Sequence, residues 1–217
     1  MSMIIRENKT CVICGKEGRY PAVASTNEFG ACDLDLRPAE MRRSTMPAWV
    51  EECDSCGYVS RDVSKLPADV EDDNSVKAIL LSHQYAFTED RYFTSDLAVK
   101  FYKHYVINRE LKKHRMAFNS LVYAAWACDD ADDKDNAAFC RKLAAEYLDI
   151  IFEQEGSDDN LLLQKADLLR RSGSFDEVIK QYSQVTFENA FFNKIVAFQI
   201  EKAKLGDDNC YTVADVK

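Results

Sequence analysis

The spacing of apolar residues divides the chain into two unlike parts. From about residue 75 onwards, apolar side chains recur every three or four positions, as on one face of an α-helix. The stripes are Leu97, Phe101, Tyr105 and Val106; Leu111, Phe118, Leu121, Val122, Ala125 and Trp126; and Phe139, Leu143, Tyr147, Leu148 and Ile151. The spacing predicts a helix near residues 75–87 and longer helices after it. No proline follows Pro67, so no helix after that position is interrupted by a proline.

The first 66 residues show short β-like runs with glycines and prolines between them. One of these runs, from Asp33 to Leu36, alternates aspartate with leucine and predicts a strand with one solvated face. A polar, acidic stretch over residues 64–75 contains a proline and is typical of a connector. We therefore predict an α+β protein, with a small β module over residues 1–66 and an all-helical domain over residues 67–217.

Composition narrows the class of protein. The 217 residues include 47% hydrophobic residues, enough for an ordinary core. The 28 basic and 37 acidic residues give a net charge of −9, which disfavours nucleic acid as a partner. Residues 67–217 carry 19 basic and 27 acidic side chains, so most of the acidity lies there. Because no apolar run approaches the ~20 residues of a membrane span and the start does not resemble a signal peptide, we expect a cytoplasmic protein that binds no membrane.

Four of the eight cysteines form two Cys-x-x-Cys pairs, Cys11 with Cys14 and Cys53 with Cys56. A glycine follows each pair and allows the backbone to turn around a metal. Four thiolates favour one tetrahedral Zn²⁺, and a closed shell of four sulfurs indicates a structural role. The 38 residues between the pairs exceed the spacing of a minimal four-cysteine site. An extra strand or loop is therefore expected between them.

Two other interpretations of the cysteines remain open. A thioredoxin-like redox pair would need one Cys-x-x-Cys to open a helix in a βαβ unit, whereas short β-like runs follow both pairs here. Structural disulfides are the second alternative, and they are rare in chains without an export signal. We leave Cys32, Cys128, Cys140 and Cys210 without a chemical role.

Several short sequence motifs follow one another between and around the two cysteine pairs: Ser25-Thr26-Asn27-Glu28-Phe29-Gly30, Asp33-Leu34-Asp35-Leu36-Arg37-Pro38, Glu40-Met41-Arg42-Arg43-Ser44-Thr45-Met46, Trp49, and Tyr58. With them, residues 11–60 resemble a family of uncharacterised bacterial proteins that join a zinc-ribbon-like module to tetratricopeptide-like helices. The resemblance implies that Cys11, Cys14, Cys53 and Cys56 are the zinc ligands. It implies no activity, because none is assigned to that family. Val12 and Asp54 stand where a knuckle often has proline.

The segment between the pairs carries the polar residues most suited to a ligand. We assign possible ligand or partner contacts to Asp33, Asp35, Arg37, Arg42 and Trp49. Arginine guanidinium groups bind planar carboxylates and phosphates through two parallel hydrogen bonds. The alternative is an internal network in which the arginines neutralise the aspartates. No catalytic residue is assigned, and the three histidines, His83, His104 and His114, lack partners at ligand spacing.

One stretch of the helical part resembles a tetratricopeptide repeat. Ala166 takes the place of the small residue in the first helix, Gly173 that of the turn, and Tyr182 that of the aromatic that packs back. Leu162 stands where tryptophan is frequent, so the repeat is degenerate and an ordinary bundle is the alternative. Stacked helix pairs expose a concave face that can hold a peptide or protein.

These observations favour a non-enzymatic zinc-binding scaffold or adaptor, in which zinc is structural and the helical domain binds a protein partner. The first alternative is a nucleic-acid-associated zinc ribbon, compatible with the near-neutral first part. The second alternative is an enzyme or small-anion binder that uses the segment from Asp33 to Thr45.

Overall fold

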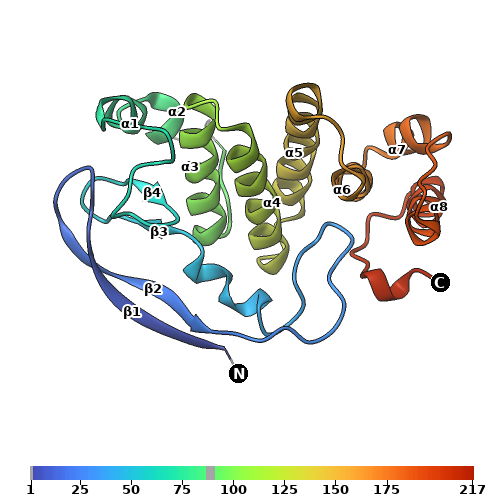
Figure 1. Cartoon of the computed structure of the whole chain (residues 1–217), viewed down its shortest axis with the longest axis horizontal. Coiled ribbons are helices and arrows are strands. Elements are labelled where there is room, and N and C mark those ends of the chain that lie inside the picture. Colours follow the sequence, from blue (N-terminus) through green and yellow to red (C-terminus); the bar gives the residue numbers. More distant parts are fainter. Residues whose placement is uncertain (1, 87–90) are drawn as a thin grey trace.

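The computed structural model describes residues 2–86 and 91–217 (Figure 1). Short antiparallel strands lie near the amino terminus, and helices make up most of the remainder, which confirms the α+β layout. The helices follow one another in chain order along the long axis of the molecule, from α1 to α8 (Figure 1). The division at residue 66 and the tetratricopeptide-like stacking stay predictions.

The strands form two separate hairpins. Strands β1 (Met3–Thr10) and β2 (Glu17–Ser25) pair antiparallel, and β3 (Glu51–Glu52) pairs with β4 (Val59–Ser60) in the same way. Each hairpin turns through one Cys-x-x-Cys-Gly sequence. A short 3₁₀ helix, η1 (Arg43–Ala48), precedes β3.

The helices begin and end where local sequence allows. They are α1 (Asn74–Leu80), α2 (His83–Ala86), α3 (Asp96–Glu110), α4 (His114–Asp130), α5 (Lys134–Glu155), α6 (Asp159–Arg171), α7 (Phe175–Tyr182), α8 (Ala190–Lys204) and the 3₁₀ turn η3 (Val213–Asp215). Side chains of Ser95, Asp133, Asp158 and Asn189 accept backbone amides at the starts of α3, α5, α6 and α8. The helix predicted near residues 75–87 is in fact two helices, and its residue 87 lies outside the described residues.

The main core lies among α3, α4 and α5. Large side chains such as Phe101, Leu121 and Leu148 are fully buried there. Alanines, including Ala124 and Ala144, are also fully buried and allow the helices to approach closely. In the next helix pair, Gly173 ends α6 with a positive φ of 77°.

A loop from the amino-terminal part crosses to the far end of the helical array. We call residues 32–38 the crossing segment; Figure 1 shows the loop after β2 reaching toward α6 and η3. Asp33 forms an isolated β-bridge with Thr212, and the amide of Leu34 donates to the carbonyl of Tyr211 over 2.9 Å. The predicted strand is wrong beyond this bridge, because the chain turns at Leu36, whose φ is 68°.

Candidate metal centre

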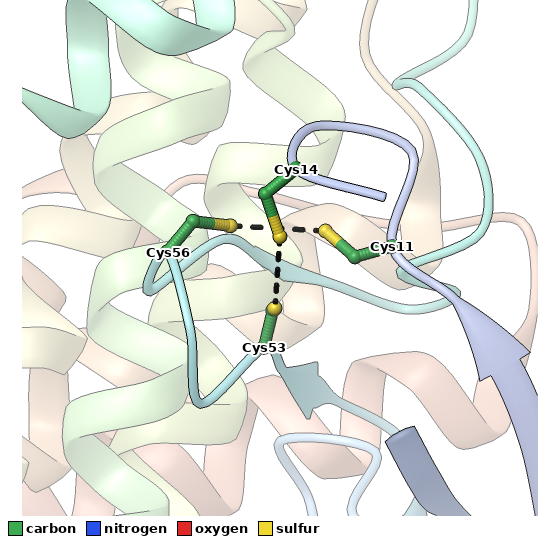
Figure 2. Close-up of side chains that lie close together, drawn as sticks. All are labelled: Cys11, Cys14, Cys53 and Cys56. Atoms are coloured by element: carbon green, nitrogen blue, oxygen red, sulfur yellow. Dashed lines mark hydrogen bonds between the residues drawn. The ribbon is translucent and has the colours of Figure 1, made fainter. Parts of the chain in front are cut away.

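The four cysteines of the two pairs converge on one point. Figure 2 shows their sulfur atoms directed toward one another from the tips of the two hairpins. The Sγ atoms lie 3.7 Å apart for Cys11 and Cys56 and 3.6 Å apart for Cys14 and Cys53. All four lie within 4.8 Å of one another, whereas a disulfide would require about 2.05 Å. The four thiols are therefore free and within metal-binding distance.

The two knuckles have the same local backbone geometry. The amide of Gly15 donates to the carbonyl of Cys11 over 2.9 Å, and the amide of Gly57 donates to that of Cys53 over 2.8 Å. Their φ angles are 72° and 73°, in the left-handed region that favours glycine. Each turn thus brings its two cysteines to one side of the hairpin tip, as the glycines in the sequence predicted.

The thiols of the cluster differ in their pKa values. The backbone amide of Lys16 lowers the pKa of Cys14 to about 7, whereas burial raises the pKa of Cys11 and of Cys56. Tyr20 of β2 lies beside Cys53 as a buried neighbour whose hydroxyl pKa is raised by burial. Because metals bind thiolates, binding at this centre releases protons.

Other contacts hold the two hairpins together around the sulfurs. Lys9 of β1 donates to the Glu51 carboxylate over 2.6 Å, and that carboxylate is 2% exposed. Its second oxygen accepts the amide of Val63 over 2.9 Å. The amide of Val12, inside the first knuckle, donates to the carbonyl of the same Val63 over 2.9 Å. The candidate metal centre therefore joins hairpins that already share a partly buried ion pair.

The chemistry of the centre follows from its ligands. Four sulfurs fill a tetrahedral shell and leave no position for water or substrate. Within residues 2–86 and 91–217, no other group of His, Cys, Asp or Glu side chains gathers closely enough to hold a metal. The arrangement therefore suits a structural metal.

Of the other candidate residues, Asp35 lies deepest in the protein. Its side chain is completely buried, and its Oδ2 accepts hydrogen bonds of 2.8 Å from Trp126 Nε1 and from Arg171 Nη1. Arg141 Nη2 lies 3.7 Å from the same oxygen. Gln164 Nε2 donates to the Asp35 carbonyl over 2.7 Å. The crossing segment thus places a carboxylate among residues of α4, α5 and α6.

A second carboxylate balances the two arginines. Asp129 accepts hydrogen bonds from both Arg141 and Arg171, the latter over 2.8 Å. Burial opposes ionisation of Asp129, but the two guanidinium groups outweigh it and lower its pKa. We call Asp35, Asp129, Arg141 and Arg171 the buried charge cluster. Its members are separated by up to 136 residues along the chain, so no local sequence signal links them.

Asp33 and Arg37 also have partners within the protein. Asp33, 2% exposed, accepts a hydrogen bond of 2.6 Å from Arg43, and burial raises its pKa. Arg37 donates to Asp130 over 2.5 Å and lies 5.9 Å from the centre of the Trp126 ring. The two side chains therefore lie in internal contacts rather than on an open surface.

Arg42 and Trp49 occupy a different environment. They line a cavity of 420 Å³ between the amino-terminal part and α4, together with Arg61, Tyr123 and Trp126. We call this space the inter-module cavity. The sequence pattern places Trp126 on an apolar helix stripe and Tyr123 at the start of a helical unit, and it gives no signal that either of them or Arg61 contacts a ligand. Their types and spacing are equally typical of a core and of a solvated surface, so only the folded chain brings them together.

One of the three histidines, His104, lies inside the helical part. His104 is buried, and its Nδ1 lies 2.8 Å from Ser120 Oγ. Burial and the nearby Arg61 lower its pKa to about 4. Because Ser120 donates to the Met116 carbonyl over 2.6 Å, it accepts from His104, whose Nδ1 therefore carries the proton.

Comparison with protein-family models, curated proteins and solved structures finds no match to this chain. The cysteine cluster and the helical part are consistent with the resemblance noted from the sequence, and the family itself stays a prediction. Among the helices of the described residues, none is long and apolar enough to cross a membrane.

Proposed function

We propose that the protein is a non-enzymatic zinc-binding scaffold, in which one structural Zn²⁺ is held by Cys11, Cys14, Cys53 and Cys56. The observation that carries the proposal is the convergence of four thiols, all within 4.8 Å of one another and 3.6–3.7 Å apart in two of the pairs. Tetrahedral zinc with Zn–S bonds of about 2.3 Å places its sulfurs about 3.8 Å apart. Zinc fits this donor set without an open coordination position.

The role of the zinc is to fix the segment between the knuckles. Both ends of residues 15–52 lie beside metal ligands, and this segment includes Asp35, which binds the helical array, and Trp49, which packs 5.4 Å from Tyr123. Lys103 of α3 adds a hydrogen bond of 2.7 Å to Glu52, next to Cys53. Zinc therefore stabilises the attachment of the amino-terminal part to the helices as well as the two hairpins.

The helical part would bind a protein partner with a basic surface. Its excess of acidic over basic residues supports this choice, because electrostatic complementarity favours encounter with such a partner. The end of α5, the turn after it and the start of α6 are exposed and carry Glu153, Glu155, Asp158 and Asp159. Charge reversal at Glu153 and Asp159 should weaken capture of the partner, whereas reversal of exposed Glu17 on β2 should not.

The zinc proposal is tested by elemental analysis of the purified chain. We expect about one zinc per chain, lost in Cys11→Ser and in Cys53→Ser, and retained in the matched variant Cys210→Ser, whose exposed residue lies outside the cluster. A chain that contains no metal, or that keeps its zinc in both knuckle variants, would refute a four-cysteine zinc site.

A further inference from the structure

The inter-module cavity has the size and position of a small-molecule site. Its 420 Å³ falls within the range of about 300–1,000 Å³ that is typical of ligand pockets. Its walls come from three stretches: the loop between the knuckles, the residues after β4, and α4. Pockets of this kind form preferentially where two parts of a protein meet.

Aromatic rings form its walls. Trp49 and Tyr123 meet edge to face with ring centres 5.4 Å apart, and Tyr123 lies 5.2 Å from Trp126. The indole N–H of Trp49 donates to Thr45 and that of Trp126 donates to Asp35. Both N–H groups are satisfied inside the protein, so the half-buried Trp49 and the edge of the largely buried Trp126 line the cavity with apolar ring atoms. Such surfaces favour a flat, unsaturated ring.

Two arginines flank the aromatic walls. Arg61 is exposed and forms no hydrogen bond or ion pair with any described residue. Arg42 is also exposed, and its contact with Glu28 is long, at 3.5 Å. Glu28 in turn accepts the amide of Ala39 through its other oxygen, over 3.2 Å. Two arginines therefore line the cavity together with one carboxylate, which already has a backbone donor.

We propose that the inter-module cavity binds a small planar organic anion, a flat ring that bears a phosphate or carboxylate group. The ring lies against Trp49, Tyr123 and Trp126. The anionic group binds Arg61 and Arg42 through charge-assisted hydrogen bonds and replaces Glu28 as the partner of Arg42. This site goes beyond the scaffold role and is distinct from the metal centre.

The chain supplies its own reporter for this proposal. It contains two tryptophans, and both line the cavity. Titration of the zinc-loaded full-length chain with AMP, under selective tryptophan excitation, should change the emission saturably, with half-saturation below about 1 mM. Adenosine supplies the ring alone and inorganic phosphate the anion alone. Each should require at least about tenfold higher concentration, because each lacks half of the recognised chemistry.

A second arm uses phenyl phosphate and benzoate, which distinguish a phosphate from a carboxylate on the ring. Arg61→Gln should weaken the better of these probes about tenfold, since it removes one charge-assisted hydrogen bond. Arg61 is exposed and its charge disfavours protonation of the nearby His104, so removing that charge should not destabilise the fold. Arg19→Gln, an equal loss of charge at an exposed position on β2, is the matched control and should leave binding unchanged.

Three results would overturn the proposal. The first is the absence of saturable change with AMP, phenyl phosphate and benzoate alike. The second is equal affinity for AMP and inorganic phosphate, which would show that the ring is not recognised. The third is equal weakening by Arg61→Gln and Arg19→Gln, which would indicate general charge attraction. None of these results depends on whether the helical part has a protein partner.

Discussion

Removal of the Asp35 carboxylate tests how strongly the crossing segment is anchored. In Asp35→Ala, the Trp126 indole N–H loses its acceptor and Arg171 loses a 2.8 Å ion pair, both in a fully buried site. Arg141 and Arg171 would then share Asp129 alone. Breaking a buried ion pair by removing one partner costs about 3–5 kcal/mol. We expect the free energy of unfolding to fall by that amount.

The assay is urea denaturation at neutral pH, followed by tryptophan emission and by circular dichroism. The matched control is Asp208→Ala, which removes an exposed carboxylate without a described hydrogen bond and should change stability by less than about 0.5 kcal/mol. Asp35→Asn keeps the shape but removes the charge, so it separates packing from electrostatics. A loss below about 1 kcal/mol in Asp35→Ala would show that the cluster does not anchor the segment.

Three further predictions concern the metal, His104 and Tyr182. Chelation should increase amide hydrogen exchange in residues 2–66 much more than in α4 and α5, because binding energy at a structural metal is largely folding energy; uniform exchange would contradict this. Since the folded-state pKa of His104 is lowered from 6.5 to about 4, the unfolded chain takes up its proton first as pH falls. The free energy of unfolding should therefore decline by up to about 3 kcal/mol between pH 6.5 and 4. His104→Gln should make it depend less on pH over this range, and the NMR resonances of the His104 ring should show the low pKa directly. Tyr182→Phe deletes a hydrogen bond of 2.8 Å to the Leu162 carbonyl and should cost about 1 kcal/mol in thermal unfolding, unlike Tyr92→Phe at an exposed position.

The features that sequence predicts well here are local ones. A Cys-x-x-Cys-Gly sequence carries its own turn, so both knuckles and the thiols they present follow from a few adjacent residues. The apolar stripes of α3, α4 and α5 likewise follow from a period of 3.6 residues. The Gly173 joint between α6 and α7 was also visible, because a positive φ there favours glycine.

The features that escaped prediction depend on distant partners. Alternation of aspartate and leucine from Asp33 to Leu36 is typical of a strand, yet the aspartates turn inward because Arg43, Arg171 and Trp126 lie there. The inter-module cavity escaped for the same reason, since Trp49 and Tyr123 belong to different parts of the chain. Spacing along the sequence contains no information on such pairings.

The β-bridge between Asp33 and Thr212 also limits the order in which contacts can form during synthesis of the chain. Leu34 donates to Tyr211, and Val213 donates to Cys32, so the crossing segment meets partners made about 180 residues later. At a synthesis rate of ~5–20 residues per second, about 10–40 s pass between synthesis of the crossing segment and synthesis of these partners. The two knuckles and the early helices can form in that interval, whereas the bridge itself cannot form before residue 212 is made. The contacts of Asp35 with Trp126 and Arg171 can form earlier than this bridge, so the crossing segment is expected to dock in two steps.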